Sequence, residues 1–158
     1  MTNTLEASIE IDATPEAVWT VVSDLERMGR WSPQCRVMKV FGGPVRQGTR
    51  TFNVNKKGLL VWPTSAKVIR FEPNRAVAWR VTENHTIWTY ELTATETGTR
   101  VTERREAPTG TTGISSFLVD KFMGGTADFE VDMISGMNTT LSRIKSEVES
   151  ATATATTR

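Results

Sequence analysis

Cysteine and histidine are scarce in this sequence of 158 residues, which contains only Cys35 and His85. One thiol cannot form an internal disulfide, and one thiol with one imidazole cannot supply the ligand set of a zinc site. His85 lies among Glu83, Asn84 and Thr86, which are typical of a solvated hairpin tip. We therefore expect no metal site, and the sequence assigns no catalytic residue.

An excess of charge of one sign and long apolar runs are also absent. The 19 basic and 18 acidic residues give a net charge of +1, so no broad electrostatic surface for nucleic acid is expected. No apolar run reaches about 18 residues, and the opening MTNTLEAS has neither the basic stretch nor the apolar run of a secretion signal. Glycine motifs that bind phosphates or dinucleotides are missing. We expect a cytoplasmic protein with no cofactor, no nucleic-acid partner and no membrane insertion.

The length fits one domain, which we expect to be a ligand-binding domain over residues 1–149. A chain of this size buries roughly 70% of the surface that it exposes when unfolded. Residues 150–158 are rich in alanine and threonine, a composition that we interpret as a disordered tail. We expect a monomer or a weak homodimer.

Residues that favour β-structure concentrate in seven segments separated by turn signals. Strands are predicted at 5–11, 37–41, 49–55, 60–71, 75–82, 86–94 and 99–107. Short turns at 42–44, 73–74 and 96–98 make sequential strands antiparallel neighbours.

Helical patterns lie before and after these strands. Thr14 as N-cap and Pro15 at the first helical position predict a helix that Gly29 ends, followed by a non-helical link at 31–33. A short helical piece is predicted at 115–123, and glycines on both sides of it predict a mobile entrance over 109–125. From Thr126 a long helix is predicted by apolar positions at Ile134, Met137, Leu141, Ile144 and Val148.

Hairpin register brings large side chains together across three of the strands. The predicted pairs are Val77 with Tyr90, Trp79 with Trp88, Tyr90 with Glu103, and Trp88 with Arg105. The alternate positions of the last strand are all polar and predict its solvent-facing side; they are Arg100, Thr102, Arg104 and Glu106. Glu103 and Arg105 therefore share the inner side with the aromatic residues, and we expect Arg105 to lie over Trp88.

We interpret this inner side as the wall of an apolar pocket with a few polar contacts. The candidate ligand-binding residues are Phe52, Trp79, Trp88, Tyr90, Glu103, Arg105, Phe122, Met133 and Met137. The alternative is an ordinary core, because tryptophan and methionine fill protein interiors and arginine often packs on an aromatic ring.

Several short motifs resemble those of the polyketide cyclase/dehydrase-like branch of the START and birch-pollen-allergen (SRPBCC) superfamily. They are the run IEIDATPEAVW at 9–19, Ser-Asp at 23–24, Trp-Ser-Pro at 31–33, Phe-Glu-Pro at 71–73, Gly-Met at 136–137 and LSRIK at 141–145. The resemblance implies an α+β helix-grip fold. Such a fold has a seven-stranded antiparallel sheet curved around a long C-terminal helix, two short helices after strand 1, and a cavity between sheet and helix.

Three functions are open at this point, because that superfamily includes aromatase/cyclases, lipid carriers and hormone receptors. The first is the binding of a small hydrophobic molecule, as carrier or sensor. The second is a cofactor-independent cyclase, aromatase or dehydratase, a lyase acting on an aromatic or polyketide-like molecule. The third is a protein-interaction module that uses the exposed sheet edge or the last helix.

Overall fold

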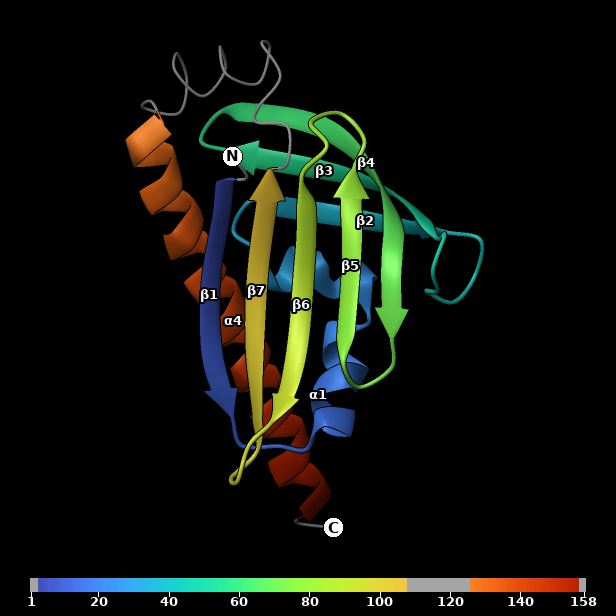
Figure 1. Ribbon diagram of the computed structural model, residues 1–158, viewed down its shortest axis with the longest axis vertical. Coiled ribbons are helices and arrows are strands. Elements are labelled where there is room, and N and C mark those ends of the chain that lie inside the picture. Colours follow the sequence, from blue (N-terminus) through green and yellow to red (C-terminus); the bar gives the residue numbers. More distant parts are fainter. Residues whose placement is uncertain (1–2, 108–125, 157–158) are drawn as a thin grey trace.

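The computed structural model describes residues 3–107 and 126–156, which form one curved sheet, a group of short helices and one long helix (Figure 1). The strands are β1 (Asn3–Ile11), β2 (Cys35–Phe41), β3 (Arg50–Lys57), β4 (Leu60–Glu72), β5 (Ala76–Val81), β6 (Ile87–Ala94) and β7 (Thr99–Ala107). They are all antiparallel to their neighbours, in the order β1-β7-β6-β5-β4-β3-β2. Each strand lies within two residues of its predicted bounds, so the seven-stranded sheet is confirmed.

The helix after β1 begins as predicted. Thr14 is the N-cap of α1 (Pro15–Val22), and its Oγ1 accepts a hydrogen bond from the backbone N–H of Ala17 at 3.2 Å. However, the structure does not have one continuous helix from Pro15 to Gly29. Ser23 caps α1, and a 3-10 turn over Leu25–Arg27 leads into α2 (Met28–Trp31).

Gly29 has a different role from the predicted one, because it lies inside α2 instead of ending a helix. A Cβ atom at this position would lie 2.2 Å from the carbonyl oxygen of Arg36, so glycine allows α2 to contact the backbone at the start of β2. Trp31 is also helical and not part of a link. Its buried ring donates a hydrogen bond from Nε1 to Oε2 of Glu147 at 2.5 Å, which joins α2 to the long helix.

The long helix α4 spans Thr126–Thr156 and starts where the sequence predicts. Its buried stripe comprises Met133, Met137, Thr140, Leu141, Ile144 and Val148. Ile134 was expected in this stripe, but 38% of its surface is exposed, because Met133 occupies the position one full turn before Met137. The helix also continues through residues 150–156, where we expected disorder. Alanine is the best helix former, and a helix already nucleated by packing extends readily into such a sequence.

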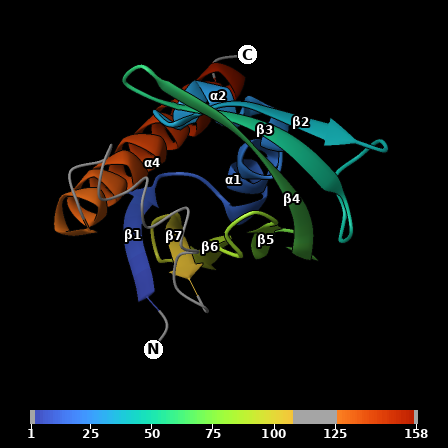
Figure 2. The same ribbon diagram turned by 90° about the horizontal axis from the view of Figure 1, so that it is seen from above.

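The sheet curls so strongly that β2, β3 and β4 lie across from β1 and β7, and α4 runs along the open side (Figure 2). Helix α4 packs along β1, and α1 and α2 pack against it from within the curl. The helix-grip architecture that the motifs implied is therefore the observed fold. Its core joins residues of all three layers, among them Val18, Leu25, Val68, Val101, Leu141 and Ile144.

Several predictions fall on residues outside the described part of the chain. They are the helical piece at 115–123, the mobile entrance over 109–125, and Phe122 as a ligand contact. Among the described helices, none has the length and apolar character needed to cross a membrane.

Candidate functional site

The pairing of β5, β6 and β7 is the predicted one. Val77 lies opposite Tyr90, Trp79 opposite Trp88, Tyr90 opposite Glu103, and Trp88 opposite Arg105. Along β7, buried residues alternate with more exposed ones, and Glu103 and Arg105 are only 3% and 4% exposed. The inner side of these strands therefore carries both aromatic rings and ionisable groups, as predicted.

A cavity of about 570 Å³ lies between this inner side and α4. Of the predicted residues, those that line it are Trp79, Trp88, Tyr90, Glu103, Arg105, Met133 and Met137. Helix α4 adds Phe129, α2 adds Met28, and β2 adds its first residue, Cys35. Trp79 stacks on Tyr90 with ring centres 5.7 Å apart, so part of the wall is a continuous aromatic surface.

Phe52 does not reach the cavity. It lies on β3 between the buried residues Thr51 and Asn53, and 43% of its surface is exposed. Side chains alternate along a strand, so the burial of Thr51 and Asn53 places Phe52 on the outer side. Sequence reasoning assigned the large apolar side chain to the interior, whereas the inner side of β3 is polar.

The sequence patterns did not reveal that part of the cavity wall, on β3 and β4, is polar. Asn53 and Asn55 of β3 line the cavity, and the Nδ2 atoms of both donate to Oγ1 of Thr64 on β4, at 3.3 Å and 3.0 Å. Thr86 lines the same region and is buried. The sequence pattern that could have revealed this polar wall is the spacing of two between Thr51, Asn53 and Asn55. It places these three side chains on one side of the strand, as an apolar alternation would.

Glu103 and Tyr90 form a buried pair at the cavity wall. The Tyr90 hydroxyl donates to Oε1 of Glu103 at 2.9 Å, whereas Oε2 has no hydrogen-bond partner among the described residues. Burial raises the pKa of Glu103 to about 8, and the hydrogen bond from Tyr90 opposes this rise. Burial, followed by the nearby Glu103 carboxyl, raises the pKa of Tyr90 well above its ordinary value. At neutral pH both groups are therefore mainly protonated.

Arg105 is on the expected side but packs differently. Its guanidinium carbon lies 5.5 Å from the ring centre of Phe129 on α4, and not over Trp88. The strand register only brings Trp88 and Arg105 next to each other, whereas the long side chain extends across the cavity toward the helix. Burial lowers the pKa of Arg105, and the negative charge of Glu130 partly offsets this effect. Arg105 thus remains a cation in the cavity wall.

Cys35 lies at the cavity wall as a thiol, and His85 lies in an exposed turn. Burial raises the pKa of the Cys35 thiol to about 11, against a smaller opposing effect of its hydrogen bond to the Val37 carbonyl. His85 is exposed with a φ of 60° in the turn between β5 and β6, which confirms the hairpin tip. Within residues 3–107 and 126–156, no three His, Cys, Asp or Glu side chains gather as metal ligands.

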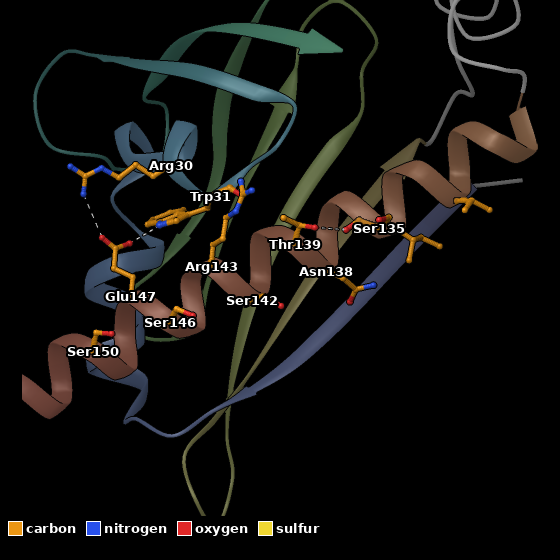
Figure 3. Close-up of a pocket in the computed structure, with 12 residues that line it drawn as sticks. Arg30, Trp31, Ser135, Asn138, Thr139, Ser142, Arg143, Ser146, Glu147 and Ser150 are labelled. Carbon is orange, nitrogen blue, oxygen red and sulfur yellow. Dashed lines mark hydrogen bonds and ion pairs between the residues drawn. The ribbon is translucent and has the colours of Figure 1, made fainter. Parts of the chain in front are cut away.

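An open groove lies on the other side of α4 (Figure 3). The α4 side chains along it are mainly small and polar, including Ser135, Asn138, Ser142 and Ser146. At one end Glu147 accepts from Trp31 and pairs with Arg30 at 3.6 Å, which ties α2 to α4. Because the aromatic and ionisable residues predicted for the site line the cavity instead, the cavity is the better candidate.

Comparison with known families agrees with this architecture. The model of the family described as polyketide cyclase/dehydrase and lipid transport matches residues 2–149. The chain belongs to this family. A comparison with curated proteins gives no match.

Solved structures with the same fold include a polyketide-cyclase-like protein, Cgl2372 from Corynebacterium glutamicum. It is 33% identical to this chain, with a TM-score of 0.61, and the alignment covers 94% of this chain and 93% of that one. The ZhuI aromatase/cyclase from Streptomyces sp. R1128 is 15% identical with a TM-score of 0.71, over 94% of both chains. The StfQ di-domain ARO/CYC of the steffimycin pathway is 10% identical with a TM-score of 0.75, over 97% of this chain and 52% of that one. The last two show a shared fold.

Proposed function

We propose that the protein binds a small, largely apolar molecule in the cavity between the sheet and α4, and that it carries or senses this molecule. The observation that supports this most is the composition of the cavity wall. Stacked aromatic rings and methionines form its apolar part, and a few buried polar groups, Tyr90, Glu103 and Arg105, lie within it. Small-molecule sites combine the same features. The family description, which includes lipid transport, is consistent with the proposal.

The size of the cavity supports the same conclusion. An apolar void costs roughly 24 cal/mol per Å³, so a dry space of about 570 Å³ would cost on the order of 14 kcal/mol. That figure is comparable with the whole stability of a domain. This space opens to solvent and part of its wall is polar, so water fills it in the absence of ligand, and an apolar molecule would displace the water that lies along the aromatic wall.

A fluorescence titration tests the proposal. An apolar probe should bind the native protein and quench its tryptophan emission, and Trp88→Ala should weaken binding because Trp88 lines the cavity. Phe52→Ala is the matched control, since it removes an aromatic ring from the outer side. The stability of both variants must be measured in parallel, because Trp88 packs partly buried against the core and truncating a fully buried tryptophan costs about 3–5 kcal/mol. Absence of probe binding to the native protein would refute the proposal.

Native mass spectrometry of protein purified from its own host identifies the ligand. A retained small molecule would favour binding over the protein-interaction module. That third function has its own basis in the exposed apolar residues Val37, Phe41, Phe52 and Val61 on the outer side of β2, β3 and β4. A cytoplasmic location and a monomer or weak homodimer stay predictions.

A cofactor-independent cyclase or dehydratase is the second candidate, and the Glu103 carboxyl favours it. A group that exchanges its proton near pH 8 inside a cavity is suited to general acid–base catalysis. Turnover of the retained molecule would distinguish this function from transport. In that case Glu103→Gln should lower kcat more than affinity, because proton transfer takes place in the transition state.

A further inference from the structure

We infer that the ligand presents a neutral hydrogen-bond acceptor, such as a ketone or ester carbonyl, to Oε2 of Glu103, and that this carboxyl binds it as a proton donor. The inference rests on the proposed function and narrows the ligand to a class: an apolar body with a carbonyl group, as opposed to a carboxylate.

The geometry of the carboxyl is the first argument. Oε1 of Glu103 already accepts the hydrogen bond from Tyr90, while Oε2 has no partner among the described residues although the side chain is 3% exposed. Glu103 lines the cavity, so the space next to this carboxyl is where a ligand would lie. Buried polar atoms are almost always hydrogen-bonded, so an unpaired one on a residue that lines a cavity indicates a missing partner. Oε2 itself is fully buried, so a ligand reaches it when the carboxyl turns toward the cavity.

The charges around the carboxyl are the second argument. Neighbouring strands contribute Tyr90 on β6 and Ala7 on β1, neither of which carries positive charge. The other titratable or charged groups that line the cavity are Cys35, Arg36, Lys56, Lys57, Arg105 and Asp132. Lys57 pairs with Asp132 at 2.7 Å. Within the described part of the chain, no cation forms a salt bridge with Glu103.

Since none of the described cations pairs with Glu103, burial dominates the protonation of this carboxyl and raises its pKa to about 8. The carboxyl is then mainly neutral at physiological pH and can donate one hydrogen bond. A carbonyl oxygen accepts that bond without bringing a second charge into the cavity, whereas a carboxylate would bring one.

Arg105 offers the competing arrangement, in which a carboxylate ligand pairs with the guanidinium. Its cation, however, already lies over the Phe129 ring and is attracted by Glu130. A contact at Glu103 predicts that the cavity prefers a carbonyl compound and that substitution of Glu103 changes how binding depends on pH. A contact at Arg105 predicts that the cavity prefers a carboxylate. Experiment can therefore distinguish the two arrangements.

Three probes with the same aromatic body make the test: acetylnaphthalene, ethylnaphthalene and naphthoate, titrated calorimetrically into the full chain. Acetylnaphthalene should bind roughly tenfold more tightly than ethylnaphthalene, because one hydrogen bond is added. Its affinity should fall roughly eightfold between about pH 6.5 and about pH 9.5 as Glu103, with its pKa of about 8, loses the proton and the roughly tenfold gain from the hydrogen bond disappears. Ethylnaphthalene should show no such fall.

Variants of the pair complete the test. Glu103→Gln should keep the preference for acetylnaphthalene, because its amide is a neutral donor, and should abolish the pH dependence. Glu106→Gln, on the opposite side of the same strand, is the control and should change neither. If Glu103→Gln does not fold, Tyr90→Phe removes the hydrogen bond that lowers the pKa of Glu103, and the fall in affinity should move to higher pH.

The inference is overturned if acetylnaphthalene and ethylnaphthalene bind equally, or if naphthoate binds most tightly, which would assign the polar contact to Arg105. It is also overturned if the pH dependence persists in Glu103→Gln. Those results leave the proposed function intact, since an apolar probe still binds. If none of the three probes binds, the proposed function is refuted, and the inference with it.

Discussion

Replacing Glu103 with glutamine should change how the stability of this protein depends on pH. The folded protein holds the proton of the buried carboxyl up to a pKa of about 8, whereas an exposed glutamate in the unfolded chain releases it at about 4.5. Between these values the folded state binds one more proton than the unfolded state. Rising pH therefore favours unfolding across this window.

The size of the effect follows from the two pKa values. They differ by about 3.5, and each pKa unit corresponds to about 1.4 kcal/mol, so the total is on the order of 5 kcal/mol. The stabilisation by the neutral carboxyl is fully present below about pH 4.5 and is lost once the pH has risen through about 8. A domain is stable by only about 5–15 kcal/mol, so the effect of this one group is large compared with the whole free energy of unfolding.

Urea unfolding of the native protein and of Glu103→Gln at several pH values measures this loss. The difference in the free energy of unfolding between them should grow in favour of the variant by about 4 kcal/mol from about pH 4.5 to about pH 8, because each end of this window lies at a titration midpoint. Glu106→Gln controls for the removal of a carboxylate from the same strand. A difference that stays constant within about 1 kcal/mol over this window would refute the burial argument.

Three further predictions follow from other contacts. Arg105→Lys should weaken binding of an apolar probe roughly threefold to tenfold, because lysine cannot pack its cation flat on the Phe129 ring of the cavity wall as the planar guanidinium does, whereas Arg104→Lys on the opposite side should not. The Cys35 thiol should react with a disulfide reagent roughly tenfold more slowly than in the unfolded chain, because a pKa of about 11 instead of 9.0 lowers the thiolate fraction more than it raises the nucleophilicity of the thiolate, and ligand should slow it further. Gly29→Ala should destabilise the protein by roughly 1–3 kcal/mol, because the new Cβ would lie 2.2 Å from the Arg36 carbonyl oxygen.

Each of these has a result that counts against it. Equal binding by Arg105→Lys and Arg104→Lys would remove Arg105 from the site. Labelling of Cys35 at the rate of the unfolded chain would mean that the thiol is not buried in solution. For the glycine, Gly136→Ala is the control, since its Cβ would meet Pro33 at an ordinary 3.5 Å; equal unfolding free energies of the two variants would contradict the close contact.

Much of the fold could be predicted from local patterns. The strands, the cap at Thr14 and the pairing of Tyr90 with Glu103 follow from side-chain alternation, capping chemistry and hairpin register, which act over a few residues or across one turn. The tail over 150–156 is the exception among local predictions. There the helix formed upstream outweighs the low complexity of the composition.

Contacts between distant segments could not be predicted in this way. Phe52 was assigned inward on hydrophobicity, yet the inner side of β3 is set by Asn53 and Asn55, whose partner Thr64 lies on the next strand. Gly29 reads as a helix end, but its role depends on the carbonyl of Arg36. In both cases the deciding neighbour belongs to another element.

The same distinction holds within the site. Alternation along β7 is enough to place Glu103 and Arg105 on the inner side, because a strand has only two sides. That Oε2 of Glu103 finds no partner among the described residues, and that Arg105 lies over Phe129 and not over Trp88, depends on how far the sheet curls and how closely α4 approaches it. Curvature and helix docking result from packing over the whole domain. They determine the electrostatic environment of a carboxyl whose position in the sheet is encoded locally.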